Sequence, residues 1–504
     1  MSLKHNIFAS YAAQIYVTSV GILILPMYLK YMGPEAYGLV GFFAMLQAWF
    51  NLLDMGLTPT VARETARFRG GATDAMSYRR LLRVLQLIFC IAALLGACIV
   101  FGLSGFIAEH WLKVQTLPLA QVQLALQLMA GGVALRWMSG LYRSCISGAE
   151  RQVWLGGFNS FVATLRFVGV LPLLIWIGHS PAAFFTYQLI IAVIELLGLV
   201  FKARSLFPAV PHGNILGWSF ASLVTPIHSV LKFSLTIAFT SLVWVLITQT
   251  DKLLLSKLLP LADYGYFTLA VLVASGIMLV SGPISGALTP RMARLQAEGD
   301  EAGLIALYRG ATQMVAVISI PACLVLALFP EQVLLAWTGD LEVAARAAMV
   351  LRLYSLGNGL LAFAAFPYYL QFAKGDLKLH FIGNLIFLVV LIPLLIWATW
   401  IHGAVGAGYA WLAVNSIYFF LWPPLVHSKF SPDLHRSWLI KDIGPIVLAV
   451  LPAAGVSLLF LPWPEGRSQI TLLLFAYGMI FLFACALGSK KIRRLLNVRI
   501  LHFN

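Results

Sequence analysis

Seven ionisable side chains stand inside long apolar stretches of the sequence, where charges are otherwise rare. They are Arg136, Arg166, Lys252, Arg352, Asp54, Glu195 and Asp251. In a membrane helix, a charge near the centre costs at least ~2.5–3.5 kcal/mol to insert, so such a side chain should face protein or water. Guanidinium groups also bind phosphate oxygens two at a time. These residues are therefore the first candidates for binding or moving a charged group.

Three of these side chains lie near the middle of their apolar stretches, namely Arg136, Arg166 and Glu195. We expect Arg136 and Arg166 to line a cationic cavity that attracts a phosphate-bearing group. The alternative is a structural ion pair, for instance with Glu195. Glu195 itself has two interpretations, as the carrier of a coupling proton or as the partner of Arg166.

The other four lie nearer the ends of their stretches. Arg352 either lines the cavity or extends to the membrane interface. Asp251 and Lys252 are adjacent, so they either neutralise each other or act in gating or coupling. Asp54 comes shortly before Gly56, and it either braces a distorted helix or belongs to a gate.

Two apolar stretches carry polar residues at helical spacing. Ser10, Gln14 and Thr18 follow one another at spacings of four, and Ser234, Ser241 and Thr248 at spacings of seven. Such stripes suit a hydrated cavity that binds polar groups, although Ser and Thr also join helices to one another. We therefore add Ser10 and Gln14 to the candidate substrate-binding residues.

The amino-acid composition indicates the environment in which these side chains lie. Of 504 residues, 61% are hydrophobic and 11% are charged, and the formal net charge is +15. An ordinary soluble domain has about 25% charged residues. A water-soluble enzyme is therefore excluded, and the apolar runs favour a polytopic membrane protein over a partner of nucleic acid. The five cysteines have no CxxC spacing and the ten histidines form no HExxH pair, so we expect no metal and no cofactor beyond a coupling to an H⁺ or Na⁺ gradient.

A membrane-spanning helix needs about 20 predominantly apolar residues. The hydropathy pattern predicts an all-α protein with about 14 such helices. They are expected at 8–29, 38–60, 82–107, 120–142, 153–177, 183–203, 231–257, 264–289, 309–329, 348–372, 379–401, 404–426, 441–461 and 469–488.

Lysine and arginine gather in alternate loops. With both termini in the cytoplasm, most of these residues fall on the cytoplasmic side, as the positive-inside rule requires. Arg143 belongs to this set, in the loop after 120–142. The opposite side holds Lys30, Lys113, Lys257, Arg346 and Arg467. The first apolar stretch is interpreted as a membrane helix, not as a removable signal peptide.

The two halves share short sequences in the same order. Leu57–Arg63 and Leu288–Arg294 both read Leu-Thr-Pro-x-x-Ala-Arg, and Pro172–Trp176 recurs as Pro393–Trp397. Two six-helix lobes in a parallel pseudo-two-fold repeat follow from this pattern. The predicted parts are an N-lobe (1–205), a cytoplasmic linker (206–230), a C-lobe (231–428), and two further helices with a basic tail (429–504).

Several of these segments resemble bacterial polysaccharide (O-antigen type) flippases of the multidrug/oligosaccharidyl-lipid/polysaccharide exporter superfamily. The likeness covers about residues 5–430. It is carried by Asn51–Leu57 with Arg63, Thr250–Ser256 leading into Tyr264–Tyr266, Trp337–Asp340 and Gly403–Ala407. The resemblance implies export of undecaprenyl-diphosphate-linked oligosaccharide from the inner to the outer leaflet of the bacterial inner membrane by alternating access. It also implies a part in cell-surface (lipopolysaccharide) synthesis, with a polysaccharide polymerase and chain-length proteins as partners.

Two other functions stay open. A cation-coupled drug antiporter would share the fold, but its cavity should be acidic, whereas the intramembrane charges here are mostly basic. A membrane polysaccharide polymerase would need a sizeable external loop for its chemistry, and no external loop exceeds roughly 20 residues on the predicted topology.

Overall fold

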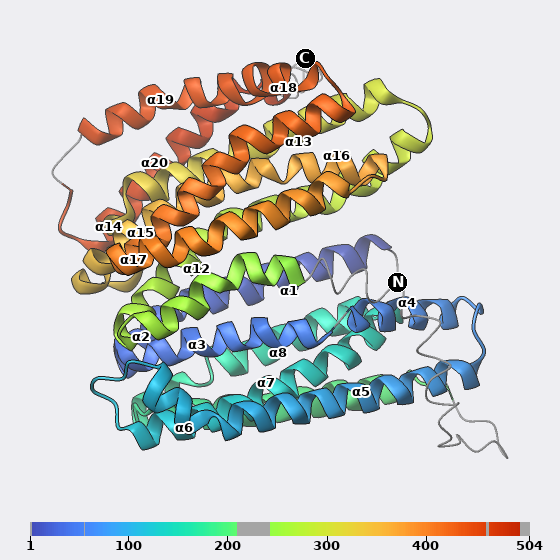
Figure 1. The fold of residues 1–504 in the computed structure, drawn as a ribbon, viewed down its shortest axis with the longest axis vertical. Coiled ribbons are helices and arrows are strands. Elements are labelled where there is room, and N and C mark those ends of the chain that lie inside the picture. The colour runs from blue at the N-terminus through green and yellow to red at the C-terminus, as the bar shows by residue number, and fades with distance from the viewer. Residues whose placement is uncertain (1–2, 55, 209–241, 460–462, 494–504) are drawn as a thin grey trace. The chain divides into compact units, whose positions relative to one another are not determined.

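The computed structural model describes residues 3–54, 56–208, 242–459 and 463–493, and it is helical throughout that part of the chain, with no extended strand (Figure 1). The side chains of 3–11 and of several residues in 279–290 are not described. Contacts divide the chain into two compact units, Met1–Gly265 and Tyr266–Asn504. The predicted all-α class is confirmed.

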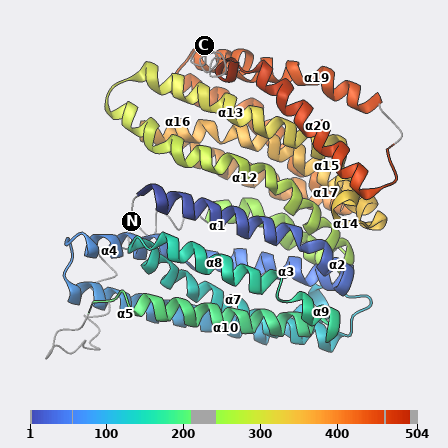
Figure 2. The same ribbon diagram turned by 180° about the vertical axis from the view of Figure 1, so that it is seen from behind.

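The helices of the first unit run mostly side by side (Figure 2). They are α1 (Leu3–Leu23), α2 (Leu25–Met32), α3 (Pro34–Phe50), η1 (Asn51–Asp54), α4 (Leu57–Arg69), α5 (Ala75–Gly102), α6 (Ser104–Phe106), η2 (Ile107–Trp111), α7 (Leu119–Gly148), α8 (Gln152–Phe167), α9 (Leu171–Trp176) and α10 (Pro181–Arg204), and residues 242–258 are also helical. Helix α7 is at the centre, because it packs against α10, α5, α4 and α3.

The second unit takes most of α12 (Leu261–Ala297) and the helices after it. These are α13 (Glu301–Leu328), α14 (Pro330–Thr338), α15 (Leu341–Ala364), α16 (Phe366–Lys374), α17 (Lys378–Phe430), α18 (Leu434–Ser437), η3 (Trp438–Ile443), α19 (Gly444–Leu459) and α20 (Arg467–Gly488). Helices α19 and α20 pack against each other and against α13.

Within the described residues, 11 helical segments are long and apolar enough to cross a membrane. One of them, α17, has 53 residues and is interrupted by the non-helical backbone of Gly403, so it contains two of the predicted spans. Helix α7 has 30 residues and adds a further long helix at a predicted position. The total of about 14 stays a prediction, and residues 231–241 of the seventh predicted helix lie outside the described residues.

The predicted boundaries of α7 were wrong at one end. The prediction placed a span at about 120–142 and Arg143 in the loop after it, but α7 continues to Gly148. Arg143 is therefore a helix residue and not a loop residue. Its side chain projects from this helix into the candidate site described below.

The repeated Leu-Thr-Pro-x-x-Ala-Arg sequence has two different local structures. In the first unit it begins α4, directly after Gly56 at φ 70°. In the second unit it lies inside the continuous helix α12. The predicted lobes and linker stay predictions, and most of the linker, from 209 onward, lies outside the described residues.

The two helices beyond the repeat are attached to α13 by a buried polar group of side chains. The Asp442 carboxylate accepts from the Arg309 Nε atom at 2.6 Å and from the Gln313 amide at 2.7 Å. Gln313 in turn accepts from the Ser489 hydroxyl at 3.0 Å, just after α20. Asp442 is 2% exposed, so this pairing ties η3, α13 and the end of α20 into one packed unit.

Candidate substrate cavity

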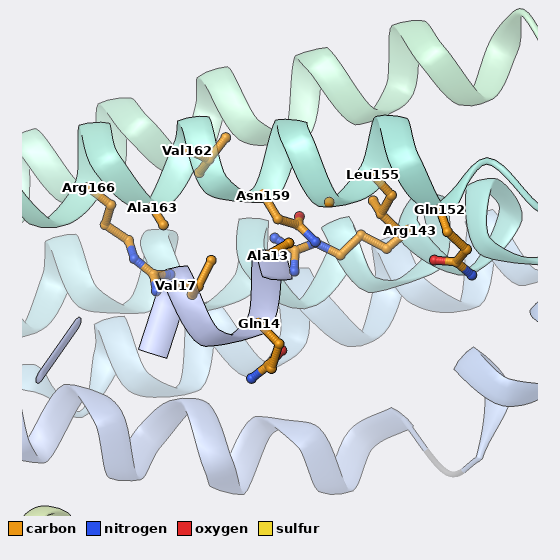
Figure 3. A pocket seen from close by; sticks show the side chains of 11 residues that line it. Ala13, Gln14, Val17, Arg143, Gln152, Leu155, Asn159, Val162, Ala163 and Arg166 are labelled. Atoms are coloured by element: carbon orange, nitrogen blue, oxygen red, sulfur yellow. The ribbon is translucent and has the colours of Figure 1, made fainter. Parts of the chain in front are cut away.

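A cavity of about 250 Å³ opens between α1, α7 and α8 of the first unit (Figure 3). Its lining consists of Ala13, Gln14 and Val17 from α1, Arg143 from α7, and Gln152, Leu155, Gly156, Asn159, Val162, Ala163 and Arg166 from α8. The lining thus combines two guanidinium groups and three carboxamides, and its described residues include no carboxylate.

Arg166 stands on the last turn of α8 and points into this cavity. Its guanidinium lies over the ring of Phe167, 4.4 Å from the ring centroid. The Nε atom is buried without a hydrogen-bond partner, and among the described residues no carboxylate pairs with this side chain. The salt bridges of the described residues therefore do not include the pair of Arg166 and Glu195 that was the alternative interpretation.

Glu195 pairs with Arg143 instead. The Arg143 Nη2 atom donates to Glu195 Oε1 between α7 and α10. The Glu195 side chain is 2% exposed and that of Arg143 is 38% exposed. The carboxylate is thus enclosed between helices, while the guanidinium that it holds also lines the cavity. Within the described residues, the second oxygen of Glu195 has no hydrogen-bond partner.

Arg136 is seven residues before Arg143 on α7, and it does not line the cavity. Its Nη2 atom donates to the Gln188 side-chain oxygen at 2.7 Å. Its guanidinium also lies over the ring of Phe43, 5.0 Å from the ring centroid. Gln188 then donates to the backbone carbonyl of Arg166 at 3.0 Å. The structure therefore brings Arg136 and Arg166 together through one glutamine.

The polar face of α1 reaches the cavity through Gln14, whose amide donates to Thr18 at 3.4 Å. Two residues after Gln14, the Tyr16 hydroxyl and the Thr164 hydroxyl are hydrogen-bonded at 2.7 Å, which joins α1 to α8. Ser10 lies in α1, but its side chain is outside the described residues, as are Ser234 and Ser241.

Asp54 ends η1 and lies beside the first turn of α4. Its carboxylate accepts from the Thr58 amide at 3.1 Å and from the Thr58 hydroxyl. These contacts satisfy an amide that has no partner inside the helix. The geometry is that of a cap on a helix that restarts after Gly56, which corresponds to the bracing interpretation.

Asp251 and Lys252 neutralise each other in part. The Lys252 ammonium donates to Asp251 Oδ1 at 3.2 Å and to the Thr248 carbonyl at 2.6 Å.

Arg352, in the second unit, donates from Nε to the Ala327 carbonyl at 2.9 Å, in the last turn of α13. A cation is favourable at a helix C-terminus, so this contact explains how the charge of Arg352 is stabilised.

The sequence interpretation missed four residues of this region. Arg143 was assigned to a loop, and Gln152, Asn159 and Gln188 are amides in apolar helices that carry no formal charge. The position of Asn159, two turns before Arg166 on α8, was the available signal, because both then lie on one helical face. The described residues include no group of three His, Cys, Asp or Glu side chains that would hold a metal ion.

Comparisons with known proteins place the chain in a family. The family model described as polysaccharide biosynthesis protein matches residues 3–296. A search of curated proteins finds no match.

Solved structures share the fold at low sequence identity. The lipid II flippase MurJ in its inward closed conformation is 13% identical, with a TM-score of 0.72 over 95% of this chain and 97% of that chain. An inward-facing multidrug resistance MATE family transporter of the MOP superfamily is 14% identical, with a TM-score of 0.68 over 83% and 96%. The MATE multidrug transporter DinF-BH is 17% identical, with a TM-score of 0.58 over 85% and 96%.

The structural similarity establishes the fold, but sequence identities this low do not establish the substrate. The fold is that of MurJ and the MATE transporters. The resemblance expected from the sequence motifs is confirmed by the family match, which covers more than half of the chain. This membrane protein belongs to the polysaccharide biosynthesis protein family.

Proposed function

We propose that the protein is a flippase that moves undecaprenyl-diphosphate-linked oligosaccharide from the inner to the outer leaflet by alternating access. The observation that carries this proposal is Arg166, a guanidinium in the cavity with no carboxylate partner among the described residues. A buried cation without a counter-ion is costly, so a site that retains one is suited to an anion that arrives as the ligand.

The charges around the cavity support an anionic ligand. Glu195 compensates one of the two lining arginines, Arg143, and leaves the charge of Arg166 in excess. In a low-dielectric interior this excess attracts anions strongly. A guanidinium also presents paired donors that match the oxygens of a diphosphate. The diphosphate is therefore the part of the substrate assigned to this cavity.

The size of the cavity limits what it holds. At about 30 Å³ for each water molecule in the liquid, 250 Å³ is the space of about eight waters, which is enough for a diphosphate and too little for a whole oligosaccharide. The carboxamides of Gln14, Gln152 and Asn159 supply both donors and acceptors near it. We assign to them the bridging oxygens and the first sugar, while the lipid tail stays in the bilayer.

Membership of a polysaccharide biosynthesis family and the fold shared with a lipid II flippase support a lipid-linked saccharide as cargo. We place the protein in the bacterial inner membrane with both termini in the cytoplasm, since the Lys and Arg distribution favours this orientation. A polysaccharide polymerase and chain-length proteins would consume the exported unit. In this proposal, transport is driven either by coupling to an H⁺ or Na⁺ gradient or by the removal of the exported unit by these partners.

The drug-antiporter alternative requires a site for cations. Because the lining of the cavity holds two arginines and no carboxylate, the described geometry disfavours it. A polymerase stays the more distant alternative.

The proposal is tested by deleting the gene in the host bacterium and analysing its lipid-linked saccharides. We expect one undecaprenyl-diphosphate-linked oligosaccharide to accumulate on the inner leaflet, and expression of the wild-type chain to clear it. An R166Q variant that inserts normally should fail to clear it. An R346Q variant serves as the matched control, because Arg346 is a surface residue paired with Glu342 at 3.1 Å. Unchanged lipid-linked pools after deletion would overturn the proposal.

A further inference from the structure

The helix that carries Arg166 is broken immediately after it. Helix α8 ends at Phe167 and α9 begins at Leu171, inside one candidate span, Gln152–Trp176. In an unbroken helix, the amides at 169, 170 and 171 would donate to the carbonyls at 165, 166 and 167. Here the Gly169 amide donates to Thr164 at 3.0 Å and the Leu171 amide donates to Val168 at 3.0 Å. The break therefore leaves carbonyls that need other donors.

Three side chains from other helices supply those donors in sequence. The Tyr187 hydroxyl donates to the Leu165 carbonyl at 2.8 Å and Gln188 donates to the Arg166 carbonyl at 3.0 Å. The Tyr28 hydroxyl donates to the Phe167 carbonyl at 2.8 Å and also lies 3.5 Å from the Arg166 carbonyl. A carbonyl without a partner is costly at membrane depth, where no bulk water can replace the lost bond. A Cβ atom at Gly169 would lie 2.4 Å from the Tyr187 hydroxyl, so any larger residue at this position would clash with that hydroxyl.

Gln188 differs from the two tyrosines because it also binds an arginine. It is 5% exposed, and its side-chain oxygen accepts from Arg136 while its amide nitrogen donates to the Arg166 carbonyl. One neutral side chain thus links the Arg136 guanidinium to the backbone from which the Arg166 side chain projects. Seven residues later on each helix, Arg143 and Glu195 make the corresponding contact, but there the partner is a carboxylate.

We propose that Gln188 is a positioning residue of the anion site, which orients Arg136 and holds the broken end of α8 at Arg166 without neutralising either arginine. The inference rests on the proposed function. A carboxamide supplies an acceptor and a donor from one uncharged group, whereas a carboxylate would cancel positive charge and a hydrocarbon would supply neither bond. Because the hydrogen bonds run in a chain from guanidinium to amide to carbonyl, each also polarises the next.

Calorimetric titration of inorganic diphosphate into the full chain in lipid nanodiscs measures this role. We expect Q188L to weaken diphosphate binding at least tenfold. The matched control is Y187F, which removes the neighbouring carbonyl bond but touches neither arginine, and it should bind within twofold of the wild type. Equal losses in the two variants, or wild-type affinity in Q188L, would overturn the inference.

A second variant gives a result that a purely structural role would not produce. In Q188E the new carboxylate pairs with Arg136 and lowers the positive charge, so binding should weaken at pH 8. Because an adjacent guanidinium favours the ionised form of a carboxyl, this group stays ionised down to pH 5, and the affinity ratio of wild type to Q188E should stay above one from pH 8 to pH 5. A ratio close to one throughout this range contradicts the positioning role.

The failure of this inference and that of the proposed function are distinguishable. If R166Q binds diphosphate as the wild type does, the cavity is not the anion site, and both proposals fail. If R166Q loses binding while Q188L and Q188E retain it, the anion site stands and the assignment of Gln188 is wrong.

Discussion

Arg143 donates a hydrogen bond to Glu195 across the packed face between α7 and α10, and the same guanidinium lines the cavity that Arg166 enters. The two arginines therefore differ in one respect that decides their roles. Arg143 makes a salt bridge with a buried carboxylate, whereas Arg166 makes no salt bridge among the described residues. We infer that Arg143 contributes mainly to the folded state and Arg166 mainly to the ligand.

The Arg143–Glu195 pair leads to a prediction about stability. An R143Q variant leaves the Glu195 carboxylate buried without a charged partner, and breaking such a pair costs about 3–5 kcal/mol. The R143Q/E195Q double variant should recover much of that loss, because two neutral amides satisfy each other. Thermal unfolding of the four proteins in detergent measures the interaction in a double-mutant cycle. Strictly additive effects would show that the pair is not coupled.

Arg166 leads to the opposite prediction, because it has no partner to lose. R166Q should unfold at the same temperature as the wild type or higher, while its affinity for inorganic diphosphate falls at least tenfold, about 1.4 kcal/mol. R166K keeps the charge but not the planar pair of donors, so it should recover only part of the affinity. A large loss of stability in R166Q would instead indicate a structural role for the guanidinium.

Asp54 is predicted to act through the start of α4. Replacing a capping aspartate by alanine typically costs about 0.5–2 kcal/mol. We expect D54A to lose stability in this range, and D54N to lose less because its side-chain oxygen still accepts from the Thr58 amide. Unfolding measurements on both variants separate the cap from a charge effect. If D54N is as unstable as D54A, the negative charge matters more than the cap.

Asp376 leads to a prediction about pH, because it lies between two candidate spans. The Lys429 ammonium donates to its carboxylate at 2.6 Å, and this hydrogen bond, with that from the Lys378 amide, holds the pKa of Asp376 below its usual value. A carboxyl with a lowered folded-state pKa stabilises the fold above its unfolded pKa of about 3.9, and this contribution is lost as the pH falls through the folded value. The stability difference between wild type and D376N should therefore be present at pH 7 and shrink below about pH 4. A difference that is constant with pH would contradict the ion pair.

The sequence predicted the helices well and the site in part, and the reasons are physical. Hydropathy detects a helix by its apolar length, so the all-α class and the positions of most spans followed directly. The same measure ended α7 before Arg143, because a charge lowers the local mean even where the helix continues. Intramembrane charge identified Arg166 and Glu195 as unusual residues.

The sequence pattern does not predict which side chains pair between neighbouring helices. The choice of Arg143 over Arg166 as the partner of Glu195 depends on how α7, α8 and α10 pack, which no periodicity encodes. Gln188 was missed because an amide has no formal charge, although its contacts with Arg136 and the Arg166 carbonyl place it at the centre of the network.

Transport by the purified chain is the measurement that tests the central claim most directly. The lipid-linked oligosaccharide that accumulates in the deletion strain is labelled on its sugar, placed in the inner leaflet of liposomes that contain the protein, and followed by its exposure to an enzyme added outside. We predict that the wild-type and R346Q proteins move the labelled sugar to the outer leaflet and that R166Q does not. Transport by R166Q at the wild-type rate, or no transport by the wild type over protein-free liposomes, would contradict the account.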